Sequence, residues 1–407
     1  MILQTPKRLA LTCIFLISFL FTVHAQMATA EKPALQEVGA AEMQGFIDAG
    51  KLAGISTLVV KDGEVLQKRI YGMDNVAESK PINTQTIFRI FSMTKPVTAI
   101  ALMTLYDEGH FQLDDKVSKY IPAFATTKVY KENEDGSVSM EEQENEMTIR
   151  HLLTHTSGLT YGWDPKHYVD SMYRANSVGG LGPGTLKDKV EQLATMPLKY
   201  QPGTQWEYSL SIDVAGYIIE VISGMPMDEY FEKAVFAPLD MDDSGFYATE
   251  DKLDRLAMIY TLDKEGKLAS GEGNWGNFVK EKPEACSGGG GMVSTIEDYS
   301  RFCQMLLNGG QLDGRRVLKE STVKLIMTDH LPADAIYGEK EKGFGYGLGG
   351  QVHLTSGTYH WLGLASTTFW VNPANNSYMI TMAQRVPSEY SYAFILKGIL
   401  DNAMAEN

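Results

Sequence analysis

The chain reads FSMTKP at residues 91–96, which places Ser92 three residues before Lys95 at the expected start of a helix. Residues i and i+3 share one face of a helix, so the lysine amine should lie beside the serine hydroxyl. A serine hydroxyl becomes a good nucleophile only when a neighbouring group takes its proton. Ser92 also suits an N-cap, and Pro96 is tolerated in the first turn of a buried helix that Gly109 should end. We therefore predict that Ser92 is a nucleophile held at a helix N-terminus.

The Ser-x-x-Lys spacing is not specific by itself, because Ser321 and Lys324 repeat it. That second pair falls in an amphipathic segment at about 318–328 and should lie on its solvent face. Other motifs must therefore support the first pair.

The first 25 residues have the pattern of a signal peptide. Lys7 and Arg8 form its basic start, an apolar stretch covers residues 9–23, and a small-residue cleavage site ends at Ala25. An uncleaved membrane anchor is the alternative, but about 15 apolar residues are short for a membrane span. We expect an exported protein, periplasmic or secreted, without an integral membrane segment after cleavage.

The composition limits the partners of the mature chain. Cleavage would leave 34 basic and 51 acidic residues, a net charge of −17, which argues against nucleic acid and anionic membranes as partners. Two cysteines, Cys286 and Cys303, would remain; they could pair in an exported protein, but we expect free thiols, because two cysteines do not make a disulfide framework. The sequence does not indicate an oligomeric state.

The expected elements place strands and helices at both ends of the chain. With 44% hydrophobic residues among 407, the chain can bury a large core, so we expect one domain over residues 26–405. The elements expected at the two ends are a helix at 35–49, a hairpin at 55–60 and 64–71, helices at 295–308 and 318–328, strands at 343–353, 358–371 and 377–385, and a helix at 389–404. We predict an α/β (α+β) fold, in which both termini build an antiparallel sheet flanked by helices. Residues 35–100 and 288–405 would form this lobe, with a mainly helical lobe inserted at 101–287.

Two segments of the middle region have unusual compositions. Residues 131–146 are strongly acidic and should form an exposed loop or small hairpin. The glycine-rich run at 287–291 lacks the Lys-Ser/Thr of a phosphate loop, so we interpret it as a hinge.

Tyr208 is the second candidate catalytic residue. It follows a Pro-Gly turn at 202–203 and precedes a helical pattern that begins near Ile212. The tyrosine should therefore lie on a constrained loop at the mouth of a helix. A packed tyrosine with a satisfied hydroxyl is the structural alternative.

A third motif reads HWLGLAS at residues 360–366, within an expected strand. A glycine inside a strand, here Gly363, often marks the close approach of a ligand or of another backbone. A bulge would be the structural alternative.

The three motifs together resemble the serine β-lactamase and penicillin-recognising superfamily, in particular the carboxylesterases related to class C β-lactamases (family VIII type). Their order along the chain is the same, and the segments at 148–159, 202–204 and 288–295 are also similar. The resemblance covers residues 35 to 400. It implies Ser92 as nucleophile, Lys95 and Tyr208 as the proton-transfer pair, and the backbone N–H groups of Ser92 and Leu364 as the oxyanion hole, with no metal or organic cofactor.

Two departures from the lactamase pattern concern the predicted substrate-binding residues Leu210, Trp361 and Gly363. Leu210 stands where the lactamase motif Tyr-x-Asn has an amide, and Trp361 stands where Lys-Thr/Ser-Gly has a cation. A site without these polar partners should disfavour an anionic substrate. We therefore expect a small-molecule ester with an apolar, uncharged acyl group.

The identity of the base stays open at this point. A phenol ionises near pH 10 in solution, but a nearby ammonium stabilises the phenolate. Alternatively, a neutral Lys95 takes the proton itself.

Other site types fit less well. His151 and His155 have the i, i+4 spacing of a zinc pair, but the third ligand and the general base are missing, so a scaffold at a helix end is the preferred interpretation. The chain also lacks the G-x-S-x-G elbow of a Ser-His-Asp hydrolase. Three functions remain: an exported serine esterase, a penicillin-binding or D-alanyl peptidase type enzyme or weak β-lactamase, and an acyltransferase or inactive binding protein on the same fold.

Overall fold

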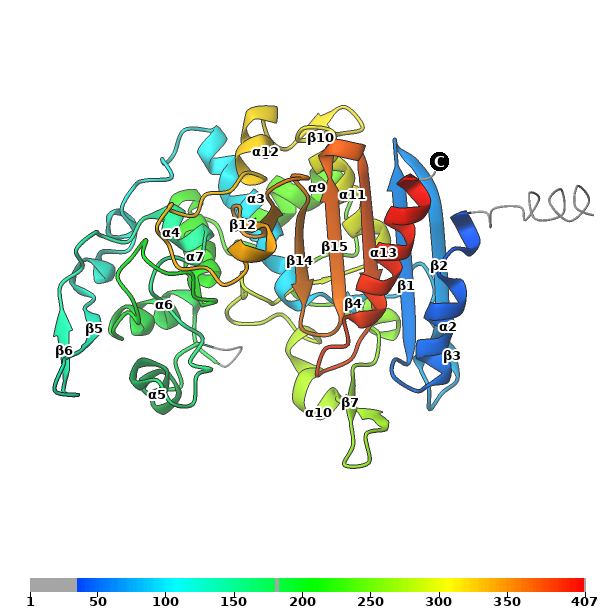
Figure 1. The fold of residues 1–407 in the computed structure, drawn as a ribbon, viewed down its shortest axis with the longest axis horizontal. Helices are drawn as coiled ribbons and strands as arrows, with labels where there is room; N and C mark the ends of the chain where they lie inside the picture. Colours follow the sequence, from blue (N-terminus) through cyan, green and yellow to red (C-terminus); the bar gives the residue numbers. More distant parts are fainter. Residues whose placement is uncertain (1–34, 180–182, 406–407) are drawn as a thin grey trace, which may run out of the picture.

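The computed structural model describes residues 35–179 and 183–405, and its largest element is an eight-stranded antiparallel sheet (Figure 1). The strand order is β12-β13-β14-β15-β16-β1-β2-β3. The bounds are β1 Gly54–Lys61, β2 Glu64–Asn75, β3 Lys80–Pro81, β12 Phe344–Tyr346, β13 Gln351–His353, β14 Tyr359–Gly363, β15 Thr367–Asn372 and β16 Ser377–Met382. Because β16 pairs with β1, the sheet joins the two ends of the chain, and the predicted fold class is confirmed.

The predicted strand boundaries near the C-terminus are wrong in two places. The segment at 343–353 forms β12 and β13 around a turn, and the segment at 358–371 forms β14 and β15. The second reversal occurs at residues 364–366, where Ser366 adopts a left-handed φ of 71°. The alternation of apolar residues continues through this turn, so the sequence pattern does not show where the chain reverses.

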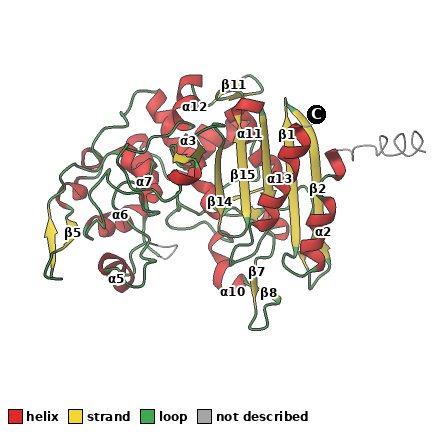
Figure 2. Ribbon diagram, viewed as in Figure 1, coloured by secondary structure: helices red, strands yellow, loops and turns green. Residues whose placement is uncertain are grey.

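Helices cover both faces of the sheet (Figure 2). On one face, α2 (Ala40–Asp48) and α13 (Ser391–Ala405) pack on side chains such as Val59 and Trp370. On the other face, α11 (Ile296–Leu307) contacts β1, β15 and β16. Because helices cover both faces and successive strand residues point to opposite faces, the central strands β1 and β16 are buried on both sides.

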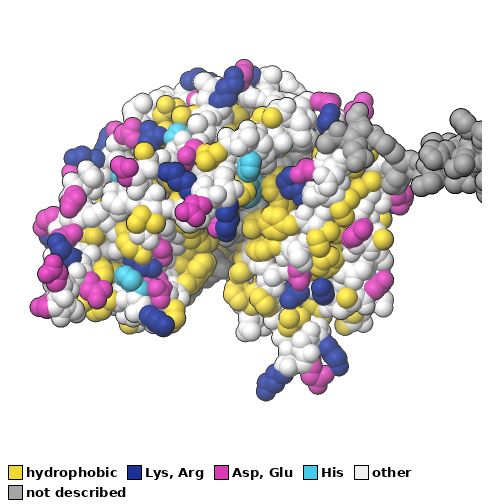
Figure 3. Space-filling view, in the orientation of Figure 1, with side chains coloured by type: hydrophobic (Ala, Val, Ile, Leu, Met, Phe, Trp, Pro, Cys, Tyr) yellow, Lys and Arg dark blue, Asp and Glu magenta, His cyan; other side chains and the backbone are white. Residues whose placement is uncertain are grey.

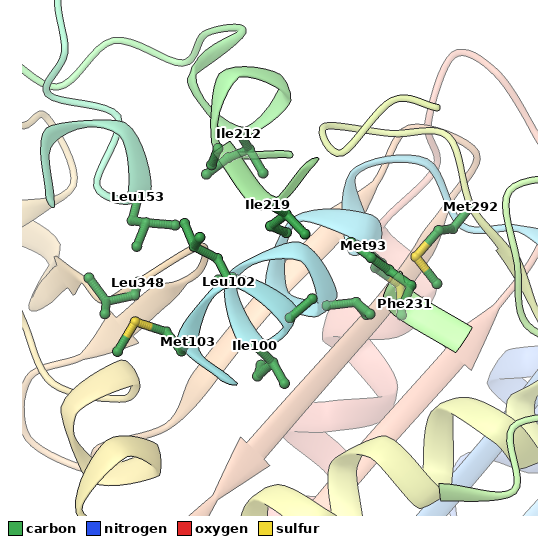
Figure 4. Close-up of a cluster of buried hydrophobic side chains, with 14 of the residues drawn as sticks. Met93, Ile100, Leu102, Met103, Leu153, Ile212, Ile219, Phe231, Met292 and Leu348 are labelled. Atoms are coloured by element: carbon green, nitrogen blue, oxygen red, sulfur yellow. The ribbon is translucent and has the colours of Figure 1, made fainter. Parts of the chain in front are cut away.

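The helix that follows Ser92 lies within a hydrophobic core separate from the one under α2 and α13. All but the last two residues of α3 (Thr94–Asp107) are buried, so it is packed on all sides rather than amphipathic. Figure 4 shows its residues Ile100, Leu102 and Met103 among side chains from neighbouring elements, including Ile219 of α7 (Ser211–Ser223). The central helix therefore gives the Ser-x-x-Lys segment a rigid support.

The middle of the chain is mainly helical, with long connections (Figure 1). Its helices are η3 Val117–Lys119, η4 Pro122–Thr126, α4 Ile149–Leu153, α5 Tyr168–Ala175, α6 Leu186–Ala194, α8 Met227–Phe231, η5 Glu232–Phe236, α9 Ala237–Leu239, η6 Glu250–Arg255, α10 Glu272–Trp275 and η7 Asn277–Val279. Short strands form three pairs, β4 Phe88–Arg89 with β9 Val293–Ser294, β5 Val129–Glu132 with β6 Val138–Glu141, and β7 Tyr260–Leu262 with β8 Leu268–Ser270. The acidic segment thus contains a small hairpin, as predicted.

The remaining elements lie near the two ends of the chain. They are η1 Leu35–Glu37, β10 Gln311–Leu312 paired with β11 Arg315–Arg316, α12 Glu320–Ile326, η8 Lys340–Lys342 and η9 Pro373–Asn375. Ser321 and Lys324 are exposed on α12, as predicted for the second Ser-x-x-Lys pair. The signal peptide predicted at 1–25 lies outside the described residues. Among the helices that are described, none has the length and apolarity that a membrane crossing requires.

The glycine-rich run is not a hinge. Gly288, Gly289 and Gly291 are buried, and a Cβ atom at Gly288 would lie 2.8 Å from the backbone oxygen of Ile212. Glycine is therefore required there by close packing rather than by flexibility. The predicted free thiols of Cys286 and Cys303 are confirmed, and both are buried.

Candidate active site

Ser92 lies in the short 3-10 turn Phe91–Met93, immediately before α3. Its predicted role as the N-cap is wrong, because Met93 occupies the N-cap position of α3. The ammonium of Lys95 instead donates a hydrogen bond to Ser92 Oγ over 3.1 Å. Phe91 has a left-handed φ of 42°, a costly conformation for a bulky residue that often marks a functional site.

Lys95 is completely buried, although an ammonium loses much solvation when it leaves water. The backbone oxygen of Gly289 accepts a second hydrogen bond from Nζ over 2.5 Å. The same atom lies 4.4 Å from the ring centroid of Tyr208 and 5.4 Å from that of Tyr161. These aromatic faces and the carbonyl compensate for the lost water.

Tyr208 lies in the loop before α7, beside the late strand of the sheet. The indole Nε1–H of Trp361 on β14 donates to its hydroxyl over 3.4 Å. The rings of Tyr161, Trp163 and Trp206 lie within 5.2–6.0 Å of its centroid. The structure therefore brings Ser92, Lys95 and Tyr208 together, and it places Trp361 in contact with the phenol.

His155 packs against Tyr208 and the loop that carries it. It is fully buried, with a left-handed φ of 56°, and its ring centroid lies 5.0 Å from that of Tyr208. Nδ1 is 3.1 Å from Ser209 Oγ, which continues a buried hydroxyl chain to Ser211 and Ser157. Burial first, and then the charge of Lys95, hold the pKa of His155 well below its usual value. The ring is therefore neutral and acts as a support.

His151 has a local structural role rather than a metal-binding one. The Thr148 N–H donates to its Nδ1, while the Thr148 hydroxyl accepts from the His151 N–H, and the two groups form a capping box on α4. Burial lowers the pKa of His151 to about 4. Nδ1 can accept this hydrogen bond only when it carries no proton, so the neutral ring suits the capping box. This arrangement fits the scaffold at a helix end that the sequence predicted.

A cavity of about 700 Å³ opens above Ser92. Its wall includes Leu210, Trp361 and Leu364 from the predicted set, together with apolar side chains of α6 such as Leu186 and Val190. Figure 3 shows apolar side chains on both sides of the hollow between the helical part and the sheet. Its size is typical of a small-molecule site.

Gly363 ends strand β14 beside the serine turn. A Cβ atom at Gly363 would lie 2.2 Å from the backbone oxygen of Ile90, so its close neighbour is a backbone segment. Leu364 follows in the turn, 36% exposed, and its side chain lines the cavity. Leu210 is buried, and its Cδ1 lies 2.6 Å from the Cβ position of Gly179.

Several residues of the site were not predicted from the sequence. Tyr161 and Trp163 stack at 4.5 Å between centroids, and both line the cavity. Asp213, in the first turn of α7, accepts hydrogen bonds from Ser287 Oγ and from the Gly289 N–H. The available signals were the position of Tyr161 just after the family-like segment at 148–159 and the nearness of Asp213 to Tyr208 in sequence.

Comparisons with known proteins identify the family of the chain. The family model described as Beta-lactamase matches residues 40–400. An uncharacterized protein of Mycobacterium tuberculosis is 32% identical over 368 residues, which cover 85% of this chain and 89% of that protein. Esterase EstB of Burkholderia gladioli is 32% identical over 272 residues, which cover 63% of this chain and 66% of that esterase.

A solved structure extends the comparison to three dimensions. EstCE1, described as a hydrolase with promiscuous acyltransferase activity, has a TM-score of 0.77 and 24% identity. The alignment covers 90% of this chain and 98% of that one. At this identity the likeness establishes the fold. The chain therefore belongs to the beta-lactamase family and has the fold of its serine hydrolases.

Proposed function

We propose that this protein is an exported serine esterase that forms an acyl-enzyme on Ser92. The observation that carries the proposal is the position of Lys95 Nζ, 3.1 Å from Ser92 Oγ and 4.4 Å from the ring centroid of Tyr208. A nucleophile and a candidate base within hydrogen-bond reach are the usual requirement for activation.

In the first step, Ser92 Oγ attacks the ester carbonyl, and its proton passes either to a Tyr208 phenolate beside a charged Lys95 or to a neutral Lys95 amine. The carbonyl oxygen becomes an oxyanion, which the backbone N–H groups of Ser92 and Leu364 would bind. The loss of one such donor typically costs roughly 3 kcal/mol in related chemistry. The alcohol then leaves with the transferred proton. Water then attacks the acyl-serine and gives a proton to the same base, the Ser92 Oγ–acyl bond breaks, Ser92 takes that proton back, and the acid is released.

The cavity supports an uncharged ester with an apolar acyl group. Leu210 and Trp361 present carbon surface and a neutral N–H where the lactamase motifs have an amide and a cation. A carboxylate placed there would lose charge-assisted hydrogen bonds. β-Lactams and D-alanyl peptides should therefore be poor substrates.

Acyl transfer to an alcohol is the second candidate. The cavity of about 700 Å³ has room for an acyl group together with an apolar acceptor. The relative EstCE1 is described as having promiscuous acyltransferase activity. The two functions share one acyl-enzyme and differ only in its acceptor.

The leader pattern at residues 1–25 supports action outside the cytoplasm. Fractionation of cells that express the full chain, with N-terminal sequencing of the product, tests this. A product that begins near Gln26 supports export, and an intact cytoplasmic chain contradicts it.

A substrate panel tests the activity. We expect turnover of p-nitrophenyl esters with C2–C6 acyl chains, little or no turnover of nitrocefin, and no lasting label from a fluorescent penicillin. Addition of an alcohol acceptor separates transfer from hydrolysis through the products formed. Strong nitrocefin hydrolysis without ester turnover would reverse the preferred substrate class.

A further inference from the structure

Asp213 holds the turn that provides the carbonyl partner of Lys95. Its Oδ1 accepts a 2.6 Å hydrogen bond from Ser287 Oγ and a 3.1 Å bond from the Gly289 N–H. The oxygen of the same residue, Gly289, accepts the 2.5 Å bond from Lys95 Nζ. Gly289 is thus held by Asp213 through its N–H and by Lys95 through its carbonyl oxygen.

The packing around this turn leaves little freedom. A Cβ atom at Gly289 would lie 2.4 Å from Asp213 Oδ2 and 2.9 Å from the Tyr161 hydroxyl. Thr98 on α3 donates a 2.7 Å hydrogen bond to the Gly288 oxygen. The turn is therefore located by α7 through the carboxylate and by α3 through the hydroxyl, and Lys95 belongs to the second of these helices.

We infer that Asp213 is a positioning residue for Lys95. Without the carboxylate, the Gly289 N–H and the Ser287 hydroxyl lose their acceptor, so the turn can move and the carbonyl no longer fixes the direction of Nζ. Lys95 Nζ then keeps its hydrogen bond to Ser92 Oγ but no longer has the Gly289 oxygen in a fixed position. Proton transfer at Ser92 should slow, because a small displacement of a catalytic group costs much of its effect. This inference rests on the proposed function of Ser92 and Lys95.

The test measures nucleophile reactivity rather than ester turnover. The second-order rate of Ser92 modification by a fluorophosphonate is followed by intact mass in the mature chain, with the modified peptide identified. We expect D213A to react at least tenfold more slowly. D213N should stay within about threefold of the unsubstituted protein, because an amide oxygen accepts the same two hydrogen bonds.

Glu220 gives a matched control on the same helix. Its Oε1 accepts a hydrogen bond from the Met227 N–H over 3.0 Å, about 10 Å along the helix from Asp213. E220A should lower the melting temperature but leave the rate of Ser92 modification within twofold. If D213A does not fold, S287A, which removes one of the two donors, should give an intermediate loss of about threefold.

The outcomes separate this inference from the proposed function. An unchanged rate in D213A, or a loss in D213N equal to that in D213A, overturns the positioning role and leaves the esterase proposal intact. A rate that depends on Asp213 in a protein that turns over no ester supports the positioning role and removes the proposed substrate. Failure of the unsubstituted protein to react at Ser92 overturns both.

Discussion

Trp361 stands where the lactamase motif has a lysine, and its indole N–H points at the Tyr208 hydroxyl over 3.4 Å. A neutral donor stabilises negative charge on the phenol oxygen as a cation would, but more weakly, and it offers no partner for a substrate carboxylate. At this residue the chain has a neutral hydrogen-bond donor to the Tyr208 hydroxyl in place of a cation.

The substitution Trp361→Phe tests this interpretation, because it keeps an aromatic ring and removes the N–H. A hydrogen bond of this kind is worth about 0.5–1.5 kcal/mol, so kcat for a short ester should fall roughly two- to tenfold, with little change in KM. Steady-state kinetics on p-nitrophenyl butyrate measure the effect. A rise in KM with unchanged kcat would instead assign Trp361 to substrate binding alone.

At the scale of elements, the site depends on the contact between the end of β14 and the serine turn. A Cβ atom at Gly363 would lie 2.2 Å from both the Ile90 oxygen and Thr367 Oγ1. The strand and the turn would have to separate, and the backbone N–H groups of Ser92 and Leu364 would move apart.

Gly363→Ala should therefore reduce kcat/KM by about 100-fold or more, since loss of one oxyanion donor alone costs roughly 10²–10³ in kcat. Gly398→Ala is the matched control, because its Cβ would meet nothing within 4 Å and the residue lies within helix α13. That change should be neutral for activity and stabilising by about 0.5–1 kcal/mol. Equal activity of both variants would contradict the predicted role of the strand end.

Elements with strong local signals could be predicted from the sequence. The first hairpin has two strand-like segments on either side of a tight turn at Lys61–Gly63, and the structure forms β1 and β2 there. The Ser-x-x-Lys spacing predicted the contact of Ser92 with Lys95. In these cases neighbours in sequence determine the geometry.

The predictions that were wrong or missing concern features that depend on packing between residues far apart in the sequence. The hinge at 287–291 was wrong because the glycines are required by contacts with Asp213 and Ile212, which the sequence does not place nearby. The reversal at Ser366 was missed because a serine, rather than the glycine that usually indicates such a turn, adopts the left-handed conformation there. Tyr161 and Asp213 reach the site from separate parts of the helical region, so nearness to a motif was the only sequence signal for either residue.

At the scale of the whole molecule, buried histidines make stability depend on pH. Burial lowers the pKa of His151 to about 4 and that of His360 to about 3, and it also lowers those of His155, His167 and His330. In the unfolded chain these groups take protons near pH 6.5. Below that pH the unfolded state binds more protons, so stability is present above 6.5 and is lost as the pH falls towards 4.

Two carboxyl groups of the described residues act in the opposite direction. Burial raises the pKa of Asp298 to about 6 and also raises the pKa of Glu220, so each native carboxyl takes a proton before the unfolded one does and adds stability as the pH falls. The five histidines oppose these two carboxyls. The melting temperature should therefore fall between pH 7 and pH 4.5.

His360→Phe should flatten that fall, because it removes one buried imidazole that stacks on Trp370 and keeps a ring of similar size. The difference in unfolding free energy between the two proteins should change by on the order of 2 kcal/mol over this range. Urea unfolding at pH 7, 6, 5 and 4.5 measures it. Parallel profiles for the two proteins would show that His360 is not involved.

The central claim is that Ser92 carries the acyl group during turnover. Acid quenching of the mature protein in the first moments of reaction with a p-nitrophenyl ester, followed by intact-mass and peptide analysis, tests this directly. We expect a mass increase equal to one acyl group on the peptide that contains Ser92, and neither adduct nor turnover in Ser92→Ala. Turnover that persists in Ser92→Ala, or an acyl group found on another residue, would contradict it.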